Sequence, residues 1–153
     1  MPLTNSLHVT GHCYCGAVTY KVDMPAGKRP RFALYCHCDS CRRAHAAALS
    51  QVVCVDTTML TITAGAELVT EFSKPPNGPV RAFCSACGSR MYNAFPGWKP
   101  DDGTTPVVFF TSTLDQAITR ELPERFRPTG HNYSEECVLD LARLEELLAG
   151  SKA

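Results

Sequence analysis

The sequence lacks any excess of charge of one sign, because fifteen Lys and Arg residues balance fifteen Asp and Glu residues. A chain with this balance has no general electrostatic attraction to nucleic acid or to an anionic membrane. It also lacks any apolar run near the roughly 20 residues that a membrane-spanning helix requires. Its first residues, MPLTNSLHVTGH, have neither the basic nor the apolar region of a signal peptide. We therefore expect a cytoplasmic protein that binds neither membranes nor nucleic acid.

Internal repeats, low-complexity tracts and long linkers are also absent from the 153 residues. That length suits one domain with its own core, and a hydrophobic content of 44% favours folding over disorder. We therefore expect residues 1–153 to form a single domain. Nothing in the sequence excludes a homo-oligomer.

Cysteine, by contrast, is abundant, with nine residues in the chain. A disulfide scaffold is the first explanation to consider, but the odd number, the missing secretion signal and the chain length argue against it. In a reducing cytosol, clustered cysteines more often bind metal ions or carry out redox chemistry.

The local pattern is mostly that of short β-strands bounded by turn residues, with two helices. We predict strands within 7–12, 17–22, 31–36, 49–55, 60–63, 67–72, 80–84 and 107–112. One short helix is expected to begin near Ser40 or Cys41 and to run through RRAHAAAL, with Asp39 as a candidate cap. A second is expected over VLDLARLEELLAG, residues 138–150. Its apolar stripe predicts a face that packs on the core or docks on a partner, and consists of Val138, Leu141, Leu144, Leu147 and Leu148.

Four cysteines form two pairs that are far apart in the sequence. Cys13 and Cys15 are two residues apart, and residues at that spacing on a strand point the same way. Cys84 and Cys87 form a knuckle whose following glycine lets backbone amides face the sulfur atoms. Together the pairs predict a closed four-thiolate zinc site. A redox dithiol at Cys84 and Cys87 is the alternative, but the surrounding sequence lacks the βαβ pattern typical of one.

Three further cysteines, Cys36, Cys38 and Cys41, lie within six residues of one another. Three protein ligands and an open position are typical of catalytic zinc. Thiolates also bind iron–sulfur clusters, although these usually need four cysteines. The spacing also allows these residues to share ligands with either pair. The remaining two cysteines, Cys54 and Cys137, are interpreted as inert thiols.

Polar residues that follow Cys41 extend this second candidate site. Arg42 and Arg43 are either an anion-binding patch for a cofactor carboxylate or solvated side chains on a helix surface. His45 is four residues beyond Cys41 and would share its helix face. It is a zinc ligand, a proton shuttle beside the metal, or a packing residue.

The cysteine motifs resemble those of the glutathione-dependent formaldehyde-activating enzyme family, which includes centromere protein V. The resemblance covers residues 8–115, and its motifs are 11–20, 36–43, 83–92 and 114–115. It implies a mainly β, β-tent-like fold of small antiparallel sheets clasped by zinc, with one or two short helices. The sequence differs from the family pattern at Ala44, His45 and Ala46, where small residues such as Ser and Gly are usual, and it matches weakly after Asp115.

The resemblance also implies two zinc ions, a structural one and a second with an open coordination position. The ligands are Cys13, Cys15, Cys84 and Cys87 for the structural zinc, and Cys36, Cys38 and Cys41 for the second. It further implies a carbon–sulfur lyase activity that joins glutathione and formaldehyde into S-hydroxymethylglutathione.

The charges at the second site agree with a thiol substrate. Zinc with three thiolates has net charge −1, so the soft sulfur of a small thiol suits its open position better than an ionised water does. The alternatives are a non-catalytic structural or interaction module, in which both zinc ions only hold the fold, and a redox sensor or metal buffer.

Overall fold

A computed structural model describes residues 4–150 except 75, 77, 119 and 120. The ends of the expected domain, residues 1–3 and 151–153, lie outside the described residues. The strands are β1 (Leu7–His12), β2 (Thr19–Met24), β3 (Phe32–Cys36), β4 (Ser50–Asp56), β5 (Leu60–Ala64), β6 (Val69–Ser73), β7 (Val80–Cys84), β8 (Arg90–Ala94), β9 (Pro106–Phe110) and β10 (His131–Asn132). The helices are α1 (Asp39–His45), α2 (Asp115–Ile118) and α3 (Leu141–Gly150). Single 3₁₀ turns lie at Thr57–Met59, Ala66–Leu68, Thr111–Thr113, Glu124–Phe126 and Ser134–Glu136.

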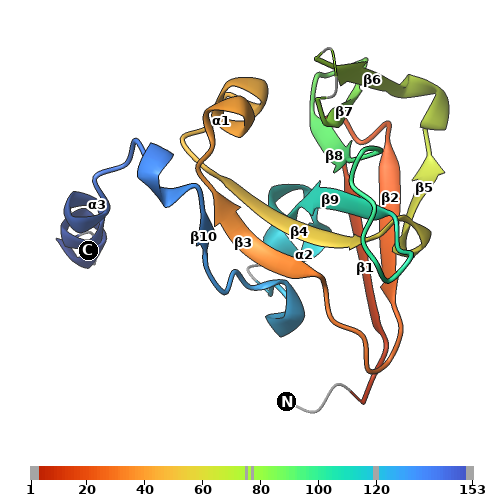
Figure 1. Ribbon diagram of the computed structural model, residues 1–153, viewed down its shortest axis with the longest axis horizontal. Coiled ribbons are helices and arrows are strands. Elements are labelled where there is room, and N and C mark those ends of the chain that lie inside the picture. Colours follow the sequence, from red (N-terminus) through yellow and green to blue (C-terminus); the bar gives the residue numbers. More distant parts are fainter. Residues whose placement is uncertain (1–3, 75, 77, 119–120, 151–153) are drawn as a thin grey trace.

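The strands form two sheets (Figure 1). A three-stranded sheet has the order β1-β2-β5, and a seven-stranded sheet has the order β10-β3-β4-β9-β8-β7-β6. All neighbours are antiparallel except β10, which pairs with β3 in parallel. The mainly β fold with small sheets and cysteine clusters that can hold zinc is therefore confirmed.

Apolar side chains cover both faces of the larger sheet. The main core contains side chains of the smaller sheet, such as Tyr20 and Val22, together with Val53 and Phe109 of the larger one. Since neighbouring residues of a strand point to opposite faces, Cys54 next to Val53 lies on the other face. There it belongs to a second apolar cluster with Val52, Val108, Phe110 and Cys36. Each face of the larger sheet therefore supports one of the two cysteine groups.

Most predicted strands are confirmed within one or two residues, but β8 and β10 were not predicted. Helix α1 ends at His45, earlier than expected, because Ala46 adopts a left-handed conformation with φ of 49°. The four-residue α2 was not predicted, and α3 begins three residues later than expected.

The apolar stripe of α3 does not pack on the core. Figure 1 shows α3 at the edge of the molecule, away from both sheets. No residue of α3 is buried, and Leu147 is 54% exposed. Core packing was therefore the wrong interpretation, while docking on a partner stays a prediction. Among the described residues, no helix has the length and apolarity needed to cross a membrane.

Candidate metal centres

The first cysteine group connects the end of β1 with the end of β7. Cys13 and Cys15 follow β1, Cys84 is the last residue of β7, and Cys87 lies in the turn after it. The four Sγ atoms all lie within 4.8 Å of one another. The Sγ atom of Cys15 is 3.4 Å from that of Cys13 and 4.0 Å from that of Cys84. The two pairs that are far apart in the sequence thus form one four-sulfur group.

Tight turns that contain glycine shape this group. Gly16 and Gly88 both have φ of 77°, a conformation that is strained for other residues. The backbone N–H of Gly16 donates to the carbonyl of Cys13 at 2.9 Å, so a turn and not a strand brings Cys13 and Cys15 together. The strand geometry expected for these two residues is therefore wrong. The expected amide contact is present, since Val18 N donates to Cys13 Sγ at 3.2 Å.

The geometry of the four sulfurs fits a tetrahedral metal ion. All nine cysteines lie within the described residues and are free thiols. A disulfide needs a separation of about 2.05 Å, much shorter than the 3.4 Å between the Sγ atoms of Cys13 and Cys15. A tetrahedron with zinc–sulfur bonds of about 2.3 Å places its sulfurs about 3.8 Å apart. The donor set therefore fits zinc, and Cys13 and Cys84 are fully buried.

Electrostatics in this group also favour a cation. Hydrogen bonds with the side chain and backbone of Ser89 lower the pKa of Cys87 to about 5. The pKa of Cys15 is raised to about 11, because its hydrogen bond with the backbone of Ala17 is outweighed by the neighbouring thiols of Cys13 and Cys87. The thiol of Cys87 therefore ionises readily, whereas the thiol of Cys15 resists ionisation, as expected when negative charges lie close together. A divalent cation removes that conflict.

The second group lies at the junction of β3 and α1. Cys36 ends β3, Cys38 is the N-cap of α1, and Cys41 lies in its first turn. Their Sγ atoms lie within 4.8 Å of one another, and those of Cys36 and Cys38 are 3.6 Å apart. Among the described residues, no further Cys, His, Asp or Glu side chain joins this group. Its donor set therefore fits a metal ion with three protein ligands and one open position.

Helix α1 begins with a sulfur cap. Cys41 N donates to Cys38 Sγ at 3.2 Å, so the cap is Cys38 and not Asp39 as expected. A hydrogen bond with Cys41 lowers the pKa of Cys36. The same contact and then burial raise the pKa of Cys41 to about 11, against the lowering effect of the nearby His45 side chain. As in the first group, the thiols cannot all ionise together without a cation.

The segment after Asp115 supports the second group from outside. His37, fully buried between two of the cysteines, has its Nε2 2.8 Å from His131 Nδ1. The backbone N–H of His37 also donates to Asn132 O at 3.0 Å. A carboxylate oxygen of Glu136 accepts a hydrogen bond from the backbone N–H of Asp39. The weakly matching segment thus closes over the cysteine loop.

His45, at the end of α1, lies beside the second group but is not one of its donors. Its Nε2 is 3.0 Å from Arg81 Nη1, and its ring centroid is 4.5 Å from that of Phe110. Since a guanidinium only donates, His45 Nε2 accepts and the ring proton is assigned to Nδ1. That buried Nδ1 has no hydrogen-bond partner among the described residues. Arg81 was not among the site residues predicted from the sequence.

Arg42 and Arg43 differ in their surroundings. Arg42 Nε donates to the carbonyl of His37 at 3.0 Å, and its guanidinium pairs with Asp39. Arg42 therefore ties the cysteine loop together. Arg43 is exposed and has no hydrogen bond or ion pair within the described part of the chain. The role of both residues in anion binding stays a prediction.

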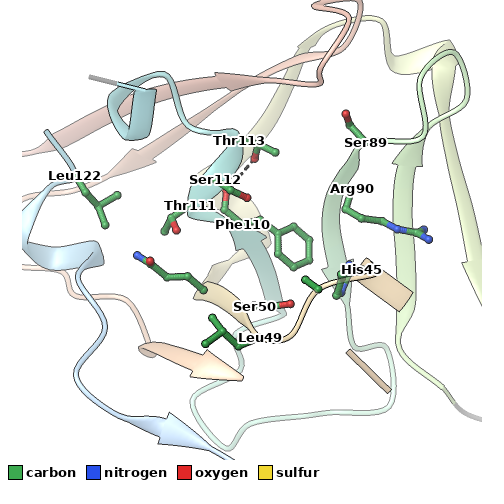
Figure 2. A pocket seen from close by; sticks show the side chains of 12 residues that line it. His45, Leu49, Ser50, Ser89, Arg90, Phe110, Thr111, Ser112, Thr113 and Leu122 are labelled. Carbon is green, nitrogen blue, oxygen red and sulfur yellow. Dashed lines mark hydrogen bonds between the residues drawn. The ribbon is translucent and has the colours of Figure 1, made fainter. Parts of the chain in front are cut away.

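A cavity of about 580 Å³ lies beside the second group. His45 and Phe110 line it, as does Ser50, which pairs with Cys36 across β3 and β4. Ser89, in contact with Cys87 of the first group, lines it as well. Figure 2 shows the side chains of His45, Ser50 and Phe110 around this space. The three cysteines do not line the cavity themselves, and its wall is formed on this side by their neighbours Ser50 and Phe110.

Comparison with known proteins places these features in context. A family model described as glutathione-dependent formaldehyde-activating enzyme matches residues 8–136. The match includes all seven clustered cysteines and continues past Asp115, so the resemblance extends further than the sequence motifs indicated. The crystal structure of a Rhodobacter sphaeroides protein, 20% identical in sequence, superposes with a TM-score of 0.51 and covers 80% of this chain and 99% of that one. At that identity the likeness concerns the fold alone.

Proposed function

This chain belongs to the glutathione-dependent formaldehyde-activating enzyme family, and from that membership we propose that it is a zinc-dependent carbon–sulfur lyase. The substrate is S-hydroxymethylglutathione, or a related adduct of a small thiol, and the products are the thiol and formaldehyde. The observation that carries the proposal is the three-sulfur group beside a cavity, with no fourth protein donor among the described residues.

The chemistry needs no oxidant or reductant. In the synthetic direction the thiolate sulfur forms a bond with the formaldehyde carbon, the carbonyl π pair moves to oxygen, and that oxygen takes up a proton. In the lyase direction the hydroxyl group loses its proton, an oxygen electron pair re-forms the carbonyl π bond, and the carbon–sulfur bond breaks with its electron pair returning to sulfur. Zinc bound at Cys36, Cys38 and Cys41 would hold the thiol as its thiolate near neutral pH.

The chain's own residues have separate tasks in this proposal. The cavity of about 580 Å³ lies in the size range of small-molecule sites and holds the thiol substrate. His45 lines that cavity, and its imidazole supplies the proton that the substrate oxygen takes up. Arg42 keeps the cysteine loop in place through His37 and Asp39. Arg43, which is exposed, attracts the carboxylates of glutathione from solvent.

The test is isothermal titration of the zinc-loaded protein with glutathione, followed by exchange NMR between formaldehyde and S-hydroxymethylglutathione at equilibrium. Uncatalysed addition of thiols to formaldehyde sets the baseline. We expect saturable binding and an exchange rate above that baseline, both lost in Cys38→Ala. Cys137→Ala is the matched control, because Cys137 lies outside both groups. Exchange at the uncatalysed rate with the wild-type protein would refute the lyase.

One observation favours a second candidate, a protein-interaction module. Helix α3 exposes Leu141, Leu144 and Leu147 to 43%, 41% and 54%, which is unusual for a stripe of apolar residues. In that case the zinc ions serve the fold, and removing α3 abolishes association while leaving the NMR exchange unchanged.

A further inference from the structure

Arg81 is a buried cation without an acidic partner. It lies in the middle of β7 and is only 7% exposed. No Asp or Glu of the described residues lies within ion-pair distance of its guanidinium. A buried charge is costly unless it is paired, so its counter-charge needs an explanation.

The two contacts of Arg81 both lead to the helix that carries Cys41. Its Nη2 donates to Ser40 Oγ at 2.9 Å, and its Nη1 donates to His45 Nε2 at 3.0 Å. Ser40 and His45 lie on either side of Cys41 in the sequence. The planar guanidinium therefore braces α1 at two points around a metal-ligand sulfur. Both acceptors are neutral, so neither balances the charge.

Other buried polar groups near Arg81 are also unpaired. Asn93 lies opposite Arg81 across β7 and β8, which places the two side chains on the same face of the sheet. The same register continues to Val108, a member of the apolar cluster that contacts the second cysteine group. Asn93 is 3% exposed, and its Oδ1 has no partner among the described residues. Within the described residues, the surroundings of Arg81 are thus polar but provide no acidic group for its charge.

The second cysteine group would supply the missing negative charge. Three thiolates and one Zn²⁺ have a net charge of −1, and a fourth thiolate from a substrate makes it −2. Arg42 cannot have this role, because its charge is already paired with Asp39. Arg43 cannot have it either, because it is exposed to solvent.

We infer that Arg81 is a positioning residue for the thiol chemistry of the second group: it fixes α1 through Ser40 and His45, and its charge balances the anionic three-sulfur metal centre. The charge matters most when a substrate thiolate occupies the open position. This inference rests on the proposed function, since it assumes that a thiolate binds there.

The experiment compares Arg81→Gln, which removes the charge but keeps a polar side chain, with Arg81→Lys, which keeps the charge. Arg143→Gln is the control, because Arg143 is exposed on α3. Each protein is loaded with Co²⁺, and the thiolate-to-cobalt charge-transfer bands are followed during titration with glutathione and, separately, with uncharged 2-mercaptoethanol. We expect Arg81→Gln to weaken the binding of both thiols by about tenfold to a hundredfold, the usual effect of losing a charge-assisted contact. Arg81→Lys should recover most of that loss, and Arg143→Gln should match the wild type.

Several outcomes would overturn the inference. If Arg81→Gln binds both thiols with unchanged affinity, the charge of Arg81 does not balance the metal centre. A loss confined to glutathione makes Arg81 a carboxylate-binding residue instead. If the wild type binds neither thiol, the proposed function fails. The inference about Arg81 is then tested by the rate at which a chelator removes the second metal. That rate must be higher in Arg81→Gln than in the wild type.

Ser40→Ala keeps the inference testable if Arg81→Gln does not fold. It removes one of the two guanidinium contacts and leaves the charge in place. We expect the second metal to be released severalfold faster than in the wild type, with the first group unaffected. An unchanged release rate would overturn the positioning role.

Discussion

His37 Nε2 and His131 Nδ1 lie 2.8 Å apart, which joins the loop between Cys36 and Cys38 to a strand 94 residues later in the chain. The two rings also stack, with centroids 5.1 Å apart. Because His37 is fully buried, this contact fixes the backbone that connects two sulfurs of the candidate metal site. The metal group and the C-terminal segment are therefore coupled in one structural unit.

The first prediction tests this coupling with His131→Ala. Removing a group that supports metal ligands typically lowers metal affinity by about 10–100-fold. We expect the second metal to be released correspondingly faster to a chelator, while the first is retained. His8→Ala is the control, since His8 is exposed and, in the described part of the chain, pairs only with Asp23. Equal release rates in His131→Ala and the wild type would show that β10 does not support the site.

The second prediction separates the two cysteine groups by their effect on folding. Cys13→Ala removes a fully buried ligand in the main core, and structural zinc contributes on the order of 10 kcal/mol in small domains. We expect this variant to be unfolded or insoluble. Cys38→Ala should lose only the second metal and keep a cooperative thermal transition. Elemental analysis and thermal melts check both variants, and the reverse ranking would contradict the assignment of the two groups.

The sequence predicted the cysteine groups well, because ligand spacing reflects a local chemical requirement. Strands β8 and β10 were missed for different reasons. Strand β8 has the sequence RMYNA, in which Arg90 and Asn93 hide the apolar alternation. Strand β10 is two residues long and exists only because it pairs with β3. Such pairing depends on distant partners and leaves no local pattern.

Arg81 shows the limit of sequence reasoning at the site itself. A single arginine in a short strand usually indicates a solvent-facing position. Its burial results from the packing of α1, whose residues come about 40 positions earlier, against the face of β7. The strand geometry expected for Cys13 and Cys15 failed because β1 ends at His12, and a turn closed by Gly16, with its positive φ, follows. In both cases the tertiary arrangement determined the result.

The third prediction concerns Cys54, whose burial raises its pKa to about 12. In the unfolded chain this thiol ionises near pH 9, the ordinary value for cysteine. Above that pH the unfolded state loses the proton first, so the contribution of Cys54 to stability is complete below about pH 9 and declines as the pH rises toward 12. Cys54→Ala should lower stability at pH 7 by about 1 kcal/mol through the small cavity that it leaves.

The same variant should lose less stability than the wild type between pH 8 and about pH 10.5. Urea unfolding of the zinc-loaded protein at the two pH values measures this difference. Iodoacetamide provides an independent check, because native Cys54 should remain unmodified at neutral pH. An identical pH dependence in the variant and the wild type would exclude Cys54 as a source of alkaline sensitivity.

The last prediction concerns His45 as the residue that moves a proton during catalysis. Its Nε2 accepts from Arg81, its Nδ1 has no partner among the described residues, and its ring lines the cavity. Positioned general acids and bases contribute roughly 10²–10⁴-fold to rate. His45→Gln keeps a hydrogen-bonding group for Arg81 but cannot exchange protons near neutral pH, whereas His45→Ala leaves a space next to the cavity.

We expect both variants to retain two metal ions and to slow the NMR exchange by about 100-fold. Added imidazole should restore the rate in His45→Ala, where it can enter the space, and have no effect on His45→Gln. A Gln variant that reacts as fast as the wild type would show that His45 only anchors Arg81. Loss of metal from His45→Gln, which keeps that anchor, would make His45 a ligand.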